Sequence, residues 1–160
     1  GIEHGCEMRL VEAVEQVNEK QKTVVFNKLM NIVGSVSGKT IAVLGLSFKP
    51  ETDDMREAPS LVVIEKLLGA GATVRVFDPI AMTECKRKLG DKVTYCADMY
   101  DAAVNAEALL LMTEWRQFRM PTWNVIKKVM KGNVVVDGRN IYNREELEAL
   151  GFVYTRIGEK

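Results

Sequence analysis

From Lys39 onward the chain alternates short apolar runs with helical segments, and this alternation constrains its fold more than any other feature. The run Thr40–Leu44 is apolar and ends at Gly45, whereas Pro59–Leu68 is predicted helical, with proline at a tolerated first-turn position. Strands that alternate with helices form βαβ units with right-handed crossovers. The pattern therefore predicts an α/β fold with a parallel sheet that helices cover on both faces.

Six strands and five helices are predicted in this part of the chain. The strands are Thr40–Leu44, Thr73–Phe77, Val93–Cys96, Ala108–Met112, Asn133–Val136 and Phe152–Ile157. The helices are Pro59–Leu68, Met82–Leu89, Ala97–Asn105, Thr122–Met130 and Arg144–Leu150. This number of elements predicts a doubly wound, Rossmann-like sheet in the order 3-2-1-4-5-6, in which the first strand is central.

A further helix is predicted before this alternating region. Neither glycine nor proline occurs between Cys6 and Val33, and apolar residues recur there at near-helical spacing. The segment is one long helix or two with a joint near Lys22, and it ends in the linker-like stretch from Gly34 to Gly38. A long apolar stripe needs a partner, so we expect this helix to pack on the sheet domain or on another subunit.

Composition excludes several classes of function. The 160 residues carry 22 basic and 22 acidic side chains, so a general nucleic-acid-binding protein is not expected. His4 is the single histidine, and the three cysteines form no CxxC pair, which argues against the usual zinc sites and disulfide scaffolds. The apolar runs are too short to cross a membrane, and we expect a cytoplasmic protein without a membrane partner.

The loop after the first predicted strand is the first candidate site, because ligands of doubly wound sheets bind beyond the carboxyl ends of the strands. It reads GLSFKPETDDMREAPS from Gly45 to Ser60 and lacks the G-x-G-x-x-G turn that holds a dinucleotide. Lys49 and Arg56 could hold phosphate oxygens there. The alternative is that they only pair with the acidic residues of the same loop. The charges alone modestly favour this pairing, and the position of the loop where strand order reverses makes the two interpretations about even.

The loop after the fifth predicted strand offers a second cation, Arg139. Lys49 and Arg139 follow strands on opposite sides of the point where strand order reverses, so they should converge on one crevice, as a diphosphate site requires. Gly138 would let the backbone approach a ligand, whereas Asp137 is interpreted as a turn carboxylate or helix cap.

Three other acidic or aromatic positions are open to two interpretations. Asp78 is interpreted as a turn residue in the first place, although an acidic residue at the end of the second strand often forms a hydrogen bond to a ribose. The segment Thr113–Trp115 either lines the crevice or packs on its own domain. Asp53 and Asp54 could ligate a metal, but two carboxylates without further ligands are weak grounds, and no metal site is predicted.

The loop sequence closely resembles the G-x-x-F-K-x-x-T-x-D-x-R-E-S/A-P signature of the UDP-glucose/GDP-mannose dehydrogenase family. The segments VFDP from Val76, TEW from Thr113 and DGR from Asp137 fall in the order expected for that family. The resemblance runs from about Val11 to the end. Within the family, UDP-glucose dehydrogenases are the most similar, with GDP-mannose and UDP-N-acetylhexosamine dehydrogenases as neighbours.

The resemblance implies that this chain is the C-terminal, UDP-binding part of an enzyme that oxidises UDP-glucose to UDP-glucuronate for polysaccharide biosynthesis. Residues 1–35 would be the helical tail of a central dimerisation region and residues 39–160 the UDP-binding domain. An additional N-terminal domain would bind NAD, and the whole enzyme would be a homodimer. A cysteine-bound thiohemiacetal is expected in the mechanism, but Cys6 does not match the family's nucleophile.

By position in the signature, Phe48, Lys49 and Arg139 would contact the UDP-sugar and Arg56 would reach the NAD. No catalytic residue is assigned within this chain. The alternatives are a GDP-mannose or UDP-N-acetylhexosamine dehydrogenase fragment, or a free-standing nucleotide-binding regulatory domain.

Overall fold

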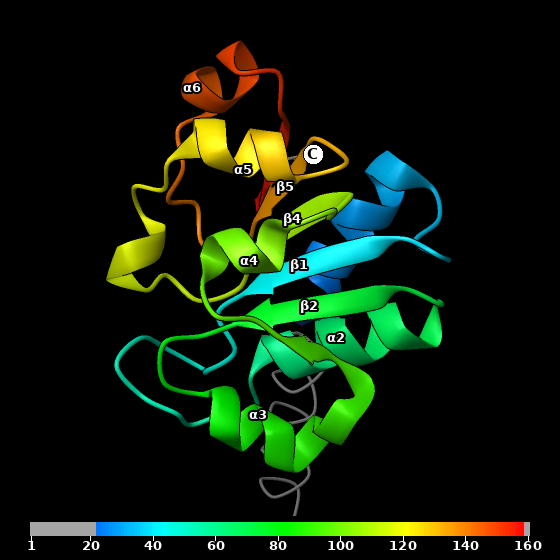
Figure 1. The fold of residues 1–160 in the computed structure, drawn as a ribbon, viewed down its shortest axis with the longest axis vertical. Helices are drawn as coiled ribbons and strands as arrows, with labels where there is room; N and C mark the ends of the chain where they lie inside the picture. The colour runs from blue at the N-terminus through cyan, green and yellow to red at the C-terminus, as the bar shows by residue number, and fades with distance from the viewer. Residues whose placement is uncertain (1–21, 159–160) are drawn as a thin grey trace, which may run out of the picture.

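The computed structural model describes residues 22–158 and contains one six-stranded parallel sheet between two layers of helices (Figure 1). The strands are β1 (Thr40–Leu44), β2 (Thr73–Phe77), β3 (Thr94–Tyr95), β4 (Ala108–Leu111), β5 (Val134–Asp137) and β6 (Val153–Arg156). Their order is β3-β2-β1-β4-β5-β6, so the predicted topology is confirmed. β1 pairs in parallel with both β2 and β4, which confirms its central position.

The helices lie close to where the sequence predicts them. They are residues 22–33, α2 (Pro59–Gly69), α3 (Met82–Leu89), α4 (Met99–Ala103), α5 (Trp123–Val129) and α6 (Arg144–Ala149). Two short 3₁₀ turns, η1 (Gly90–Lys92) and η2 (Arg116–Phe118), were not predicted. Residues 1–21, which hold most of the predicted N-terminal helix, lie outside the described residues.

α4 is shorter than the predicted Ala97–Asn105, and local chemistry sets both of its ends. The side chain of Asp98 accepts a hydrogen bond from the backbone N–H of Asp101, so Asp98 caps the helix start. Asn105, with φ of 58°, lies in the left-handed region beyond the helix end.

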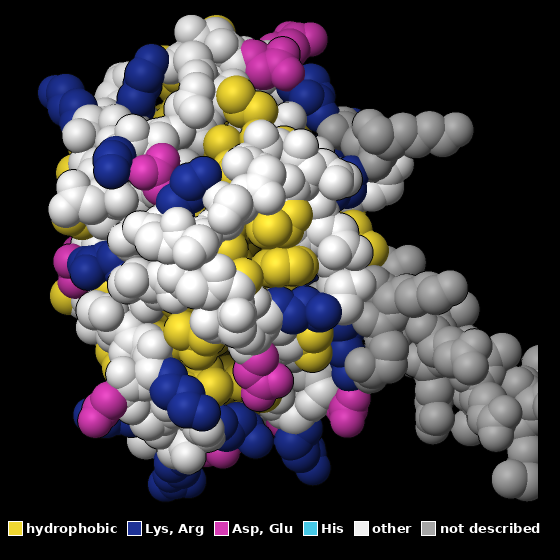
Figure 2. All heavy atoms as spheres, turned by 90° about the vertical axis from the view of Figure 1, so that its right-hand side faces the viewer, with side chains coloured by type: hydrophobic (Ala, Val, Ile, Leu, Met, Phe, Trp, Pro, Cys, Tyr) yellow, Lys and Arg dark blue, Asp and Glu magenta, His cyan; other side chains and the backbone are white. Residues whose placement is uncertain are grey.

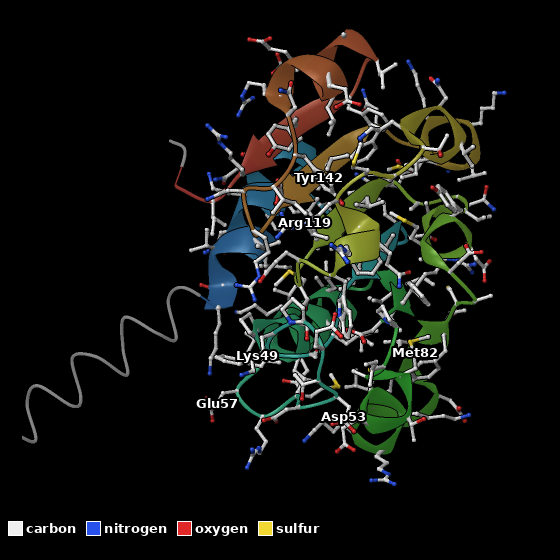
Figure 3. The ribbon with its side chains drawn as sticks, turned by 90° about the vertical axis from the view of Figure 1, so that its left-hand side faces the viewer. Lys49, Asp53, Glu57, Met82, Arg119 and Tyr142 are labelled. Carbon is white, nitrogen blue, oxygen red and sulfur yellow. The ribbon has the colours of Figure 1, made fainter. Side chains whose placement is uncertain are left out.

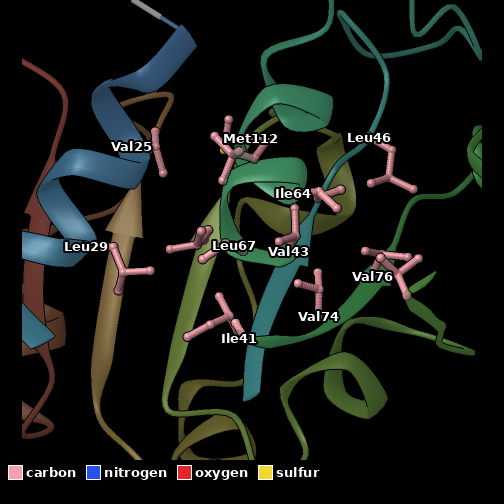
Figure 4. Close-up of a cluster of buried hydrophobic side chains, with 14 of the residues drawn as sticks. Val25, Leu29, Ile41, Val43, Leu46, Ile64, Leu67, Val74, Val76 and Met112 are labelled. Carbon is pink, nitrogen blue, oxygen red and sulfur yellow. The ribbon is translucent and has the colours of Figure 1, made fainter. Parts of the chain in front are cut away.

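The alternation of side chains along β1 divides the core into two layers. Ile41 and Val43 face one side of the sheet, and Ala42 and Leu44 face the other. The first layer packs under residues 22–33, α2 and α3, and part of it appears in Figure 4. The second layer packs under α4, α5 and α6. Both faces are therefore covered, as a parallel sheet requires.

Residues 22–33 pack on the sheet domain, which confirms that expectation for the described part of the helix. Val25 and Leu29 are buried in the first core layer beside Val136 of β5, and Figure 4 shows both side chains directed at the sheet. Within residues 22–158, no helix is long and apolar enough to cross a membrane.

Truncation at the packed face of this helix should measure its contribution to stability. Leu29 is 0% exposed, so Leu29→Ala should lower the free energy of unfolding by about 2–5 kcal/mol in urea denaturation. Ile32, on the same helix, is 38% exposed, and Ile32→Ala should cost less than about 1 kcal/mol. Equal, small losses at both positions would show that the helix is not part of the cooperative core.

Candidate functional site

A buried carboxylate at the end of β2 organises the first part of the site. Asp78 Oδ2 accepts hydrogen bonds from the backbone N–H of Leu46 (2.7 Å) and of Ser47 (3.3 Å), and from Trp115 Nε1 (3.0 Å). Asp78 Oδ1 accepts from the backbone N–H groups of residues 80 and 81. All of these donors belong to the protein, so the carboxylate holds three connections together. The turn interpretation of Asp78 is confirmed.

A second buried carboxylate does the same at the end of β5. Asp137 Oδ1 accepts from the backbone N–H of Arg139 at 2.9 Å. Its Oδ2 accepts from the N–H groups of Ile141 and Tyr142, both at 2.9 Å, and from the Tyr154 hydroxyl at 2.8 Å. Asp137 is thus a turn carboxylate, as predicted, and it fixes the backbone from which Arg139 projects.

The chain leaving β1 packs closely on the end of β4. Gly45 has φ of +91°, and a Cβ there would lie 2.5 Å from Thr113 Cβ, so only glycine fits. The Thr113 hydroxyl donates to the Ser47 carbonyl at 2.7 Å, and the Ser47 hydroxyl donates to the Lys49 carbonyl at 2.9 Å. The turn is therefore used for internal packing, and the described residues do not form the dinucleotide turn that NAD requires.

Gly138 also permits a close approach within the protein. A Cβ at this position would lie 2.5 Å from the carbonyl oxygen of Leu111 and 3.1 Å from Cγ2 of Val25. The approach that glycine allows here is thus to β4 and to the helix of residues 22–33, and a close approach to a ligand stays a prediction.

Arg139 connects the ends of three strands. Its Nη2 donates to the carbonyl of Phe48 at 3.1 Å, and its Nε lies 2.6 Å from Oε2 of Glu114. The second contact is ionic, because neither atom has a hydrogen-bond partner of normal geometry. A guanidinium carries five N–H donors, so Arg139 keeps donors for an incoming anion.

Lys49 lies next to the residue that Arg139 bonds, so the structure brings the two predicted cations to one edge of the sheet. Lys49 is exposed, and among residues 22–158 it forms no ion pair. The neighbouring Phe48 side chain is about half exposed. Figure 3 labels Lys49, Asp53 and Glu57 along the β1–α2 loop.

Arg56 is held by its own loop, as the charge-pair interpretation predicted for it. Its Nε and Nη2 donate to the two carboxylate oxygens of Asp54 at 3.0 and 2.9 Å. These hydrogen bonds lower the pKa of Asp54 to about 2. The Arg56 side chain is nevertheless 84% exposed and, with Lys88, lines a cavity of ≈ 440 Å³. Arg56 is therefore held by Asp54, whereas Arg139 is held by Phe48 and Glu114.

Backbone strain concentrates in the two loops that carry these cations. Among the described residues, four non-glycine residues have positive φ: Glu51, Glu57, Asn105 and Asn140. Three of the four lie in the β1–α2 and β5–α6 loops. Such conformations persist where surrounding contacts hold them, and they are frequent at binding sites.

Sequence reasoning missed the Glu114–Arg139 contact, which joins residues from different loops. Trp115 is buried against Asp78, which agrees with the second of the two interpretations given for it, packing on its own domain. A cavity of ≈ 210 Å³ between η2 and the β5–α6 loop is lined in part by Arg119, Trp123 and Tyr142. Within residues 22–158 no cluster of potential metal ligands occurs, and Cys6 lies outside the described residues.

Comparison with known proteins gives a match over the part of the chain that contains the candidate site. Residues 42–144 match the model of the UDP-glucose/GDP-mannose dehydrogenase family, UDP binding domain. UDP-glucose 6-dehydrogenase TuaD of Bacillus subtilis is 42% identical over 154 residues, which are 96% of this chain and 33% of the relative. A UDP-glucose 6-dehydrogenase of Rhizobium meliloti is 42% identical over 157 residues, covering 98% and 36%. The chain spans about a third of the length of these relatives.

Solved structures agree with the fold. A UDP-glucose dehydrogenase from Pyrobaculum islandicum matches with a TM-score of 0.78 and 37% identity, over 91% of this chain and 32% of the other. A UDP-D-ManNAc dehydrogenase from Pyrococcus horikoshii matches with a TM-score of 0.67 and 26% identity, over 90% and 31%. The similarity is thus greater to the UDP-glucose dehydrogenase than to the enzyme for the amino sugar.

Removing the charge of Asp78 should destabilise the connections that its carboxylate holds at the carboxyl ends of the strands. Asp78→Asn replaces an acceptor oxygen by an amide N–H₂ that faces other donors, so it should lower the free energy of unfolding by at least about 2 kcal/mol. Asp53→Asn, at an exposed position of the β1–α2 loop, should change it by about 0.5 kcal/mol or less. Thermal or urea denaturation followed by tryptophan fluorescence measures both. A stable Asp78→Asn variant would contradict the organising role of this carboxylate.

Proposed function

Because the chain belongs to the UDP-glucose/GDP-mannose dehydrogenase family, we propose that it is the nucleotide-sugar-binding domain of an NAD-dependent UDP-glucose 6-dehydrogenase. The whole protein would oxidise the primary alcohol of UDP-glucose to the carboxylate of UDP-glucuronate: two hydrides would pass to two NAD molecules, one water would supply the second carboxylate oxygen, and three protons would be released. We expect it to act as a cytoplasmic homodimer. The role of this domain is to bind and orient the nucleotide diphosphate.

One observation carries this proposal: the contact between Arg139 and the Phe48 carbonyl. It joins the loops of β1 and β5 at the carboxyl edge of the sheet, and it places a guanidinium beside the residue that precedes Lys49. Two cations from two strand ends suit a diphosphate, because guanidinium and ammonium groups both form charge-assisted hydrogen bonds to its oxygens. The exposed Phe48 ring would supply an apolar contact to the same ligand.

Glu114 moderates the charge of this site. Its carboxylate neutralises part of the Arg139 charge and holds the side chain in place before a ligand arrives. Preorganisation of this kind lowers the entropic cost of binding. The site would therefore favour a ligand with two phosphates, which can engage Lys49 as well, over a single small anion.

We expect the described residues to make only secondary contacts to NAD. The β1–α2 loop lacks the G-x-G-x-x-G sequence, so we expect another part of the protein to hold the NAD that accepts the hydride. Arg56 projects into solvent and could reach a dinucleotide held opposite this edge. The catalytic cysteine is also expected outside this domain, and residues 22–158 should be inactive alone.

Titration calorimetry of this chain with UDP, GDP and NAD tests the proposal. UDP should bind weakly, and Lys49→Ala and Arg139→Ala should each reduce its affinity by about tenfold or more, since each removes a charge-assisted hydrogen bond. Arg56→Ala should leave UDP binding nearly unchanged, because the Arg56 guanidinium is already bonded to both carboxylate oxygens of Asp54.

Lys131→Ala serves as the control for general loss of positive charge. Lys131 pairs with Glu107, which precedes β4, so it lies at the opposite edge of the sheet, where the amino ends of the strands are. Equal losses at Lys49 and Arg56 would indicate one undifferentiated anion site. Unchanged affinity in both Lys49→Ala and Arg139→Ala would refute the proposed site.

A further inference from the structure

The first described turn of the helix over residues 22–33 touches both loops of the candidate site. Val25 lies against Gly138, at the root of the loop that carries Arg139. Lys22, three residues earlier, donates a hydrogen bond to Glu57 at the end of the β1–α2 loop. Residues three apart share one face of a helix. A single helical turn therefore contacts the segments that present Arg139 and Arg56.

The ion pair between Lys22 and Glu57 is asymmetric in its exposure. Lys22 Nζ lies 2.6 Å from Glu57 Oε2, and the two residues are 35 positions apart in the chain. The Lys22 side chain is only 12% exposed, whereas Glu57 is 80% exposed. The lysine is thus fixed by its packing, and the otherwise mobile glutamate side chain is held by the lysine.

The backbone of Glu57 requires such support. Its φ of +58° lies in the left-handed region, which a residue with a Cβ adopts only where contacts hold it. Glu57 directly follows Arg56 and precedes Ala58 and Pro59, where α2 begins. Arg56 thus lies between Asp54, which accepts its backbone N–H and two guanidinium N–H groups, and Glu57, which Lys22 holds, so both contacts together fix the end of the loop that presents Arg56.

We propose that Lys22 is a positioning residue, whose ion pair with Glu57 fixes the end of the β1–α2 loop and so directs Arg56 toward a second ligand facing this edge. The inference rests on the proposed function, in which that ligand is the dinucleotide. It assigns to the helix of residues 22–33 a role beyond packing, because its first described residue holds the loop.

The alternative is that the pair is an ordinary surface ion pair, which would contribute little. The two interpretations differ in what they predict for the loop. A surface pair leaves the loop unchanged when it is removed, whereas a positioning pair releases residues 56 and 57 but leaves the Arg139–Phe48 contact in place.

The test uses the protein as its gene encodes it and compares Lys22→Met, Glu57→Gln and Lys22→Arg. Amide hydrogen exchange without ligands should accelerate at residues 55–58 in the first two variants and stay at the wild-type rate in Lys22→Arg. In steady-state assays, KM for NAD should rise about fivefold or more in the first two variants, while kcat and the dissociation constant for UDP stay within about twofold.

Two controls separate positioning from general destabilisation. Lys131→Met removes an ion pair at the opposite edge and should change neither exchange at residues 55–58 nor KM for NAD. The charge swap Lys22→Glu with Glu57→Lys should restore part of the lost exchange protection and of the lost NAD affinity.

The outcomes distinguish this inference from the proposed function. A wild-type protein that does not reduce NAD with UDP-glucose refutes the proposed function, and the positioning role toward a dinucleotide falls with it. An active wild type with unchanged exchange and KM in Lys22→Met refutes the positioning role alone. Parallel losses in melting temperature, kcat and UDP affinity would refute it as well, because they indicate a structural role only.

Discussion

Two buried carboxylates at strand ends determine how the carboxyl edge of this sheet is built. An ionised carboxylate is costly to bury unless its oxygens accept several hydrogen bonds. Asp78 and Asp137 meet this requirement by collecting backbone N–H groups from the connections around them, and one of them also binds the Trp115 indole. The loops of β1, β2 and β5 are thereby held in fixed conformations, and the exposed cations of the edge project from these loops.

The strained backbone conformations in the loops at this edge are held by the same buried contacts. Glu57 and Asn140 adopt left-handed conformations within or beside segments that these buried groups and the helix over residues 22–33 hold. The molecule as a whole carries no net charge, and both signs are spread over the face seen in Figure 2. Anion binding therefore depends on a local arrangement of a few cations, for which fixed loops are a requirement.

The sequence was sufficient for the topology because the relevant signals are local. Strand Thr40–Leu44 and helix Met82–Leu89 were predicted with the bounds that the structure shows, since each is a short periodic segment between clear turn residues. Lys49 and Arg139 were placed at one edge because the carboxyl ends of parallel strands meet there. The contact of Arg139 with Glu114 was not predictable, because it depends on side-chain directions in two loops distant in sequence. The ion pair of Lys22 with Glu57 was not predictable for the same reason, since the two residues lie 35 positions apart in the sequence.

The central claim is that Lys49 and Arg139, held at the junction of the β1 and β5 loops, form the diphosphate site. NMR titration of the isotopically labelled chain with UDP measures this most directly, because it reports every backbone amide separately. The account predicts that the largest shifts occur at Phe48, Lys49 and the residues around Arg139, with little change near Glu107 and Lys131 at the opposite edge. Shifts centred on the opposite edge, or confined to the cavity beside Arg56, would contradict it.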